Sequence, residues 1–212
     1  EIGCGAGYMS KHLANLPGRP HIISTDLSEV GLRIAKDALQ CLSNVSLQRV
    51  DAQNIPFSDS TADIVIAFDV IEHLPEPERF ISEAYRVMKP NGTLLISTPN
   101  PSSLGYRIKG HHPKEKGKPY EERMWEWHGY RDDTHINIRS INEWRGLLKK
   151  NGFIIARDGT DFWWDTPYIK HVPILLQKIL FNGTHRVLTK VVGFLPWTWG
   201  ENYLAVCRKP AI

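Results

Sequence analysis

The 212-residue sequence predicts an α/β protein in which helices cover both faces of a mostly parallel sheet, giving a three-layer sandwich. Three observations support this prediction. Short apolar runs alternate with segments of helical periodicity, one of these runs (ADIVIAFDV) is almost continuously apolar, and the chain opens on the glycine-rich turn EIGCGAGYMS. A continuous apolar run is typical of a parallel strand that is buried on both faces.

A helix is expected directly after the glycine-rich turn, because Met9, Leu13 and Leu16 recur at helical spacing. Glycine tolerates positive φ and leaves its backbone bare, and a helix N-terminus behind bare backbone is a ready site for a nucleotide-like ligand. Such a turn normally follows a buried apolar strand, yet only Glu1 and Ile2 precede it. We therefore expect the first strand to be largely missing from this chain, with an apolar strand upstream of Glu1.

The next segments alternate strand and helix. The expected strands are HIISTD (21–26), NVSLQRVDAQ (44–53), ADIVIAFDV (62–70) and GTLLISTPN (92–100), and the expected helices are LSEVGLRIAKDAL (27–39) and EPERFISEAYRVMKPNG (76–92). Ser28 can cap the first of these helices, while Pro90 and Gly92 are expected to end the second, with Met88 on its apolar face.

The alternation lapses from Pro101 to about His135, which predicts an insertion over the active site, because this stretch is too long for a simple connection. A helix then resumes with Ser140 as its cap and Gly152 at its end, and two final strands follow within 153–164 and 201–210. Residues 167–195 are apolar and amphipathic. They are most simply a pair of core-packing helices, although an interfacial helix in peripheral contact with a membrane would have the same pattern.

Composition restricts the function only broadly. The net charge of +3 does not by itself imply a nucleic-acid partner, and no apolar run reaches the length of a membrane-spanning helix. Cys4, Cys41 and Cys207 are odd in number and widely spaced, which argues against a disulfide framework and favours a reducing, cytoplasmic location.

Acidic residues end three successive predicted strands, at Asp26, Asp51 and Asp69. Ligands bind beyond the carboxyl ends of strands in open α/β sheets, and an acid about 20 residues after a glycine-rich turn is placed to accept ribose hydroxyls. Asp26 lies 21 residues after Gly5. A nicotinamide dinucleotide is disfavoured, because its fingerprint needs a third glycine where this chain has Tyr8.

Taken together, EIGCGAG, STDLS, VDAQNIPFSDSTADIVIAFDVIEHL and EAYRVMKPNGTLLISTPN resemble the class I S-adenosylmethionine-dependent methyltransferases, in particular the small-molecule branch. The resemblance implies one methyltransferase domain over residues 1–212, N-terminally truncated, with a substrate-side insertion at about 101–135. It implies a Rossmann-like, mostly parallel sheet of order 3-2-1-4-5-7-6. Because the first strand separates the second from the fourth in that order, its loss should leave a gap or a strained contact between the strands around Ile23 and Val65.

The resemblance also implies a cofactor, S-adenosylmethionine, and a role for each residue that would bind it. Glu1, Gly3 and Gly5 would hold the methionine part, Asp26 the ribose hydroxyls, Leu27, Asp51 and Ala52 the adenine, and Phe68 and Asp69 would face the methionine side. The implied reaction is methyl transfer to a small-molecule acceptor or to a lipid-linked or glycan acceptor. A domain of the same fold that binds the cofactor without turnover is the alternative from another class.

His73 and His135 are the candidate general bases, each with a structural role as the competing interpretation. The DVIEH stretch also resembles metal-assisted O-methyltransferases, in which carboxylates and a histidine hold a divalent ion. Asp69, Glu72 and His73 have the required spacing, but the same EHL sequence occurs in metal-free methyltransferases, so we expect no metal. On the acceptor side, a basic segment from Tyr106 to Lys118 is followed by aromatic residues, which favours an anionic or aromatic acceptor.

Overall fold

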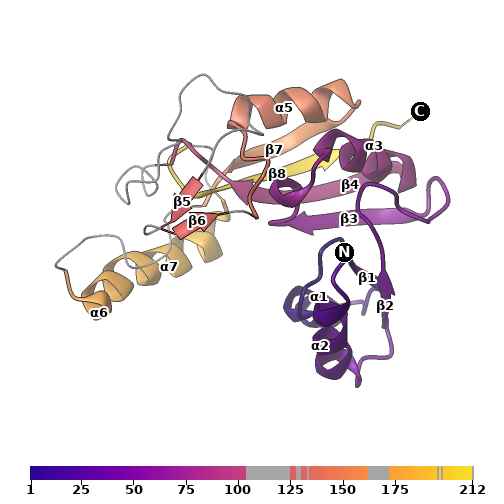
Figure 1. Ribbon diagram of the computed structural model, residues 1–212, viewed down its shortest axis with the longest axis horizontal. Coiled ribbons are helices and arrows are strands. Elements are labelled where there is room, and N and C mark those ends of the chain that lie inside the picture. The colour runs from indigo at the N-terminus through magenta and orange to yellow at the C-terminus, as the bar shows by residue number, and fades with distance from the viewer. Residues whose placement is uncertain are drawn as a thin grey trace.

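The computed structural model describes residues 1–103, 125–127, 130–132, 134–161, 172–194, 196 and 198–211 (Figure 1). The helices are α1 (Tyr8–Ala14), α2 (Glu29–Leu39), α3 (Pro77–Val87), α5 (Ile141–Lys150), α6 (Ile174–Gln177) and α7 (Gly183–Val192), with a 3-10 turn η1 (Ile71–His73) and a π-helical turn η3 (Lys178–Asn182). The strands are β1 (Ile22–Asp26), β2 (Val45–Arg49), β3 (Ala62–Phe68), β4 (Met88–Pro99), β5 (Trp125–Trp127), β6 (Tyr130–Asp132), β7 (Ile154–Thr160) and β8 (Asn202–Arg208). Helices and strands alternate as the sequence predicts.

The strands form two main sheets. A four-stranded sheet has the order β3-β4-β8-β7, in which β3 and β4 are parallel and β8 is antiparallel to both of its neighbours. A separate two-stranded sheet joins β1 and β2 in parallel. The α/β class is therefore confirmed, but the strands do not form one continuous sheet.

The start of the chain lies between these two sheets (Figure 1). Ile2 forms single parallel bridges to Thr25 of β1 and to Ala67 of β3, and its amide donates to the Ile66 carbonyl at 2.8 Å. β1 and β3 do not pair directly with each other, and Ile2 bridges to both of them. The Ile23 carbonyl also accepts a hydrogen bond from the Glu1 amino group at 2.8 Å, so the first residues of the chain lie where the gap or strained contact was expected.

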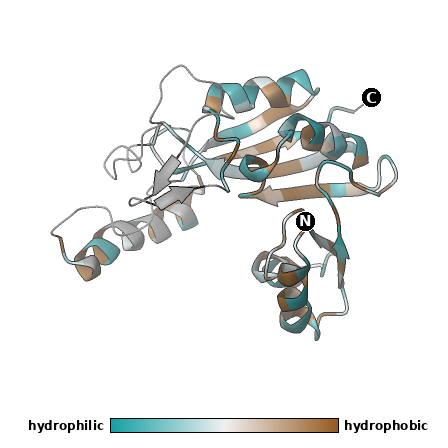
Figure 2. Cartoon of the chain, viewed as in Figure 1, coloured by the Kyte–Doolittle hydropathy of each residue, from teal (hydrophilic) through white to brown (hydrophobic). Residues whose placement is uncertain are grey.

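The main core lies between the four-stranded sheet and helices α3 and α5, and Figure 2 shows the hydrophobic residues along these strands. Its largest fully buried apolar side chains are Trp144, Tyr203, Phe80, Ile71, Ile81, Met88, Leu94, Ile96 and Leu148. Burial of each such side chain contributes about 1.5–3 kcal/mol to stability. A smaller cluster of Cys4, Ala35 and Leu39 holds the glycine-rich turn against α2.

Two predicted helix caps are confirmed by their hydrogen bonds. The Ser28 hydroxyl accepts from the Gly31 amide at the start of α2. Ser140 and Glu143 form a reciprocal capping box at the start of α5. Each cap satisfies backbone donors that a helix N-terminus otherwise leaves unpaired.

Three predictions of detail were wrong. Helix α1 ends at Ala14, so Leu16 lies outside it and is exposed. Helix α3 ends at Val87, and Met88 begins β4 instead of continuing the helix, because a residue followed by proline avoids the helical region and Lys89 precedes Pro90. β3 is not covered on both faces along its whole length, because Ile64 is 57% exposed.

Helices α6 and α7 extend from one end of the molecule (Figure 1). They are not the core-packing pair that the sequence favours, because Leu175, Ile179 and Val191 are each more than 60% exposed. Among the described residues, none of the helices has both the length and the apolar character needed to cross a bilayer. The basic stretch from Tyr106 to Lys118, Tyr120, and the pair Trp163 and Trp164 lie outside the described residues.

Candidate functional site

The predicted cofactor residues follow strand ends that face the same way. β1 ends at Asp26, β2 ends at Arg49 two residues before Asp51, and β3 ends at Phe68. The β1–β2 and β3–β4 pairs are parallel, and Ile2 bridges β1 and β3 in the parallel sense. The carboxyl ends of these strands therefore share one edge, where ligands bind in α/β proteins.

The glycine-rich turn presents bare backbone at this edge. Gly3, Gly5 and Gly7 have φ values of 72°, 49° and 80°, which a residue with a side chain adopts only under strain. A Cβ on Gly3 would lie 2.3 Å from the Val70 side chain, so this glycine is required for packing. A Cβ on Gly5 would have no atom within 4 Å, so the Gly5 backbone borders open space that a ligand can occupy.

Asp26 fixes the shape of this turn. Its Oδ2 accepts a hydrogen bond from the Gly5 amide at 2.7 Å, and its Oδ1 accepts one from the Ser28 amide at 2.8 Å. One carboxylate therefore ties the glycine turn to the start of α2. Each carboxylate oxygen can accept a second hydrogen bond, so acceptor capacity remains for a ligand.

Glu1 is directed partly into the protein. Its Oε2 accepts hydrogen bonds from the hydroxyls of Ser10 and Ser24, which also bond to each other at 2.8 Å. Burial, together with the charges of Glu1 and Asp26, raises the pKa of the neighbouring Cys4 thiol to about 12. Cys4 is therefore a protonated packing residue and does not act as a nucleophile.

The residues predicted beside the adenine differ in exposure. Leu27 is 60% exposed and lies at the edge, whereas Ala52 is only 7% exposed. The Asp51 carboxylate accepts from the Gln53 amide at 2.9 Å, which closes a local turn behind β2. Asp51 thus shapes the loop, and Leu27 offers an apolar surface.

Asp69 closes the edge after β3 in a strained conformation. Its φ is 54°, which is uncommon for a residue other than glycine and occurs preferentially at functional sites. The Ser97 hydroxyl donates to Asp69 Oδ1 at 2.7 Å, and the Asp69 amide donates to the Ser97 carbonyl at 3.1 Å. Hydrogen bonds to Ser97 of β4 therefore hold Asp69 in this strained conformation. Phe68, which precedes Asp69, is half-buried.

The structure brings His73 together with His135, which lies 62 residues further along the chain. Their rings stack with centroids 4.6 Å apart, and the His73 Nδ1 lies 2.7 Å from the Thr134 carbonyl oxygen. Glu72 is adjacent and fully buried, and one ligand atom from each of Glu72, His73 and His135 lies within 4.8 Å of the others. Burial raises the pKa of Glu72 to about 8, and the negative charge of Asp69 adds to the rise. A hydrogen bond from the backbone of Glu72 lowers the pKa, but by less than burial raises it.

Asn137 is a site residue that the sequence reasoning missed. Its amide N–H donates to the Glu72 carbonyl at 2.8 Å, and its side-chain Nδ2 donates to the carbonyls of Leu74 and Pro75. These bonds fix the segment that carries His135 against η1. The only sequence signal was a polar residue in alternation with apolar ones in HINIRS, which does not identify a distant partner.

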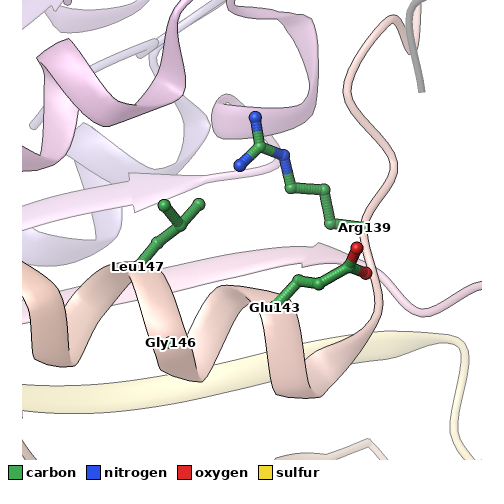
Figure 3. Close-up of a pocket in the computed structure, with 4 residues that line it drawn as sticks. All are labelled: Arg139, Glu143, Gly146 and Leu147. Atoms are coloured by element: carbon green, nitrogen blue, oxygen red, sulfur yellow. The ribbon is translucent and has the colours of Figure 1, made fainter. Parts of the chain in front are cut away.

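A pocket of about 260 Å³ lies elsewhere, on α5, lined by Arg139, Glu143, Gly146 and Leu147 (Figure 3). Gly146 supplies no side chain to fill it. Arg139 is held by an ion pair with Glu78 at 2.7 Å, and Glu143 belongs to the capping box of α5. Both charged side chains therefore have structural partners, and none of the four residues was predicted to bind a ligand.

Comparison with known proteins identifies the family to which this arrangement corresponds. The family described as a methyltransferase domain matches residues 1–157. Tocopherol O-methyltransferase of Arabidopsis thaliana is 37% identical over 101 residues, which are 46% of this chain and 29% of that protein. Ubiquinone biosynthesis O-methyltransferase of Colwellia psychrerythraea is 30% identical over 110 residues, 51% of this chain and 44% of that protein. The aligned part thus spans less than half of each of these relatives.

Solved structures share the fold. The PH0226 protein of Pyrococcus horikoshii superimposes with a TM-score of 0.66 at 21% identity, covering 98% of this chain and 79% of that one. The [4+2]-cyclase SpnF superimposes with a TM-score of 0.65 at 22% identity, covering 100% of this chain and 74% of that one. The overall fold is therefore the α/β fold of methyltransferases, which the cyclase SpnF shares.

Proposed function

The chain belongs to the S-adenosylmethionine-dependent methyltransferase family, and from this premise we propose that it transfers the methyl group of S-adenosylmethionine to a small-molecule acceptor. The observation that best supports the proposal is the glycine turn, in which Gly5 borders open space while its amide is held by Asp26. Acidic residues around this edge complement the positive charge of the sulfonium and ammonium groups of the cofactor.

We assign the cofactor contacts along the edge in chain order. Glu1, Gly3 and Gly5 would hold the methionine part, Asp26 the ribose hydroxyls, Leu27, Asp51 and Ala52 the adenine, and Phe68 and Asp69 the methionine side near the reacting sulfur. The exposed Leu27 side chain and the unused acceptor capacity of Asp26 support these roles. The Glu1 contact would use Oε1, since Oε2 is bonded to Ser10 and Ser24.

The bound cofactor supplies a methyl group that is already activated for transfer, so the chain's task is to hold the acceptor in line, exclude water and remove the acceptor's proton. Positioning alone can contribute about 7–11 kcal/mol to such a reaction. His73 and His135 are the residues that we assign to activating the acceptor. Their rings stack on each other, and His73 ends the η1 turn that follows β3.

The acceptor class is inferred from two relatives. One is named for tocopherol and the other for ubiquinone biosynthesis, and both are named O-methyltransferases. We propose an acceptor of the same kind, a hydroxylated aromatic compound that can carry a lipid chain. Residues 1–212 would act as one domain, with the stretch of about 101–135 inserted on the acceptor side.

A lipid-linked acceptor would also explain the exposed helices α6 and α7. Across α6, η3 and α7, the apolar side chains of Leu175, Leu176, Ile179, Leu180, Val187, Val191 and Val192 are exposed. Lys178 and Lys190 are exposed among them, and residues 172–194 contain no acidic residue, so this surface complements an anionic bilayer. Sedimentation with phosphatidylglycerol vesicles but not with phosphatidylcholine vesicles is expected, and equal recovery in both pellets would remove the membrane role.

The three free cysteines support a cytoplasmic location, where thiols stay reduced.

The order of the whole sheet is also part of the proposal. With Ile2 counted as the first strand, the observed pairs would combine into β2-β1-Ile2-β3-β4-β8-β7, equivalent to 3-2-1-4-5-7-6. The bridges of Ile2 to both neighbours support this order.

The proposal is tested by measuring S-adenosylhomocysteine formed from S-adenosylmethionine in the presence of catechols and hydroquinones with and without a prenyl chain. We expect product with at least one acceptor, and a large loss of kcat in His135→Ala but not in His12→Ala, an exposed histidine of α1. Cofactor binding without turnover on any of these acceptors would favour the non-catalytic alternative.

A further inference from the structure

We propose that Arg86 and Glu83 of α3 are positioning residues for the cofactor, because they hold the loop between β2 and β3 in the shape that receives the adenine. We call this loop, residues 50–61, the adenine loop. The inference rests on the proposed function, from which it takes the assignment of Asp51 and Ala52 to the adenine. Neither Arg86 nor Glu83 would touch the cofactor, so each would act only through the loop.

The Arg86 guanidinium binds two backbone carbonyls of the adenine loop. Its Nη2 donates to the Ile55 carbonyl at 2.8 Å, and its Nη1 donates to the Phe57 carbonyl at 2.8 Å. Nη1 also donates to the Asp59 carboxylate at 2.7 Å. A planar guanidinium donates in fixed directions, so these bonds determine both the position and the orientation of the segment.

Glu83 holds Arg86 and the same segment at once. Its Oε1 accepts from Arg86 Nε and its Oε2 from Arg86 Nη2, each at 2.8 Å, and Oε2 also accepts from the Ile55 amide at 2.9 Å. All five N–H donors of the guanidinium are therefore used. The hydrogen bonds from Arg86 hold the pKa of Glu83 below its usual value, so both partners are charged at neutral pH.

Both ends of the adenine loop are also bonded to α3 or to the residue before it. Near the first end, the Gln53 Oε1 accepts from the Glu76 amide at 2.8 Å, and the Gln53 amide donates to the Asp51 carboxylate at 2.9 Å. At the other end, the Ser60 amide donates to the Arg86 carbonyl at 3.1 Å. The Arg86–Glu83 pair holds the middle of the loop between these two points.

The held segment follows directly after the residues assigned to the adenine. Ile55 lies three residues after Ala52, and both side chains are buried, with 3% and 7% of their surface exposed. A shift of the Ile55 backbone must therefore move Ala52 or leave a void in the core. A loop that is already fixed in the binding shape spares the cofactor the entropy cost of ordering it. Release of the loop should therefore weaken cofactor binding.

The test is isothermal titration of the full chain and its variants with S-adenosylmethionine. Arg86→Gln and Glu83→Gln should each raise Kd about 3- to 30-fold, less than the loss of direct hydrogen bonds to a charged group would cause. The number of sites per chain should stay at one, because a variant that only misfolds lowers the number of sites and leaves Kd unchanged. Arg79→Gln is the matched control, since Arg79 of α3 pairs with Glu76 at the surface and its side chain is 64% exposed.

Titration with adenosine adds a second readout. Adenosine carries the adenine without the methionine part, so Arg86→Gln and Glu83→Gln should weaken its binding by the same factor as that of S-adenosylmethionine. A clearly larger factor for S-adenosylmethionine would mean that the whole edge is disturbed, which would overturn the positioning role.

Circular dichroism and thermal unfolding show whether each variant is folded. Glu83→Gln keeps an oxygen for the Ile55 amide, so it decides the matter if Arg86→Gln does not fold. Unchanged Kd in the folded variants, or an equal rise of Kd in Arg79→Gln, would overturn the positioning role while the proposed function stands. Absence of S-adenosylmethionine binding by the unaltered chain would overturn the proposed function, and this inference with it.

Discussion

Asn137 determines where His135 lies relative to η1. Its side-chain Nδ2 donates to two carbonyls, those of Leu74 and Pro75, and its backbone amide donates to that of Glu72. The side chain is buried, with only 3% of its surface exposed. Removing the amide would leave carbonyl groups unpaired in a region closed to water.

We expect Asn137→Ala to lower the free energy of unfolding by about 1–3 kcal/mol, the usual cost of leaving buried polar groups unsatisfied. Urea unfolding followed by circular dichroism measures this change. Asn142→Ala, at an exposed position of α5, should change the free energy by less than about 0.5 kcal/mol. Equal stability of the two variants would show that Asn137 does not anchor the segment.

At the same scale, some contacts at this edge were predictable from the sequence and others were not. Asp26 could be predicted from its distance to Gly5, because the strand and the glycine turn are local features with known geometry. The grouping of Glu72 with His135 could not be predicted, because it depends on a contact over more than 60 residues. That Glu72 is fully buried is a property of packing, which no local pattern encodes.

One carboxylate links helix α5 to two strands of the sheet. Asp158 on β7 accepts hydrogen bonds from the Arg145 guanidinium on α5 and, at 2.7 Å, from the Tyr203 hydroxyl on β8. Burial raises the pKa of Asp158, but the hydrogen bonds from Arg145 and Tyr203 outweigh burial and hold it below its usual value. Three elements therefore depend on the ionised form of one side chain.

Asp158→Asn should destabilise the protein at pH 7 by roughly 1–3 kcal/mol, because hydrogen bonds to a charged group are lost. The folded-state pKa lies below the unfolded one of about 3.9, so this stability is present above the unfolded value and disappears as the pH falls through the folded value. The difference between the unaltered chain and the variant should therefore shrink toward pH 3 in urea unfolding.

Asp63→Asn provides the matched control, since Asp63 pairs with Lys89 at the surface and its side chain is 78% exposed. Exposed pairs contribute about 0–1 kcal/mol, so this variant should change stability little at either pH. A pH-independent loss in Asp158→Asn would mean that Asp158 acts through packing and not through its charge.

The elements themselves were largely predictable. Local periodicity and caps predicted β1, α2, α5 and the final strands, because these signals act within one helix or strand. The end of α3 was misplaced, since Met88 fits the apolar face of a helix but pairs with Ala62 in the sheet. Tertiary pairing decided that boundary, and it is not visible in the helical pattern.

At the scale of the whole molecule, the β1–β2 pair with its helices and the four-stranded sheet are joined by the bridges of Ile2. The residues assigned to the cofactor come from both parts, with Gly5 and Asp26 from one and Phe68 and Asp69 from the other. The alternation of elements predicted the α/β class. The sheet is divided where β1 and β3 do not pair with each other and Ile2, alone among the described residues, bridges to both. A ligand that contacts both the β1–β2 part and the four-stranded sheet should therefore stabilise the contact between them.

Isothermal titration of the full chain with S-adenosylmethionine tests this account most directly. We expect one site per chain, and affinity at least about tenfold lower in Asp26→Ala, because hydrogen bonds to a carboxylate contribute about 1.5–3 kcal/mol each. Asp37→Ala, which removes an exposed acid from α2, should bind as the unaltered chain does. Far-ultraviolet circular dichroism must show that Asp26→Ala is folded, because Asp26 also holds Gly5 and Ser28. No binding by the folded chain, or equal affinity in both variants, would contradict the assignment of the glycine-turn edge as the cofactor site.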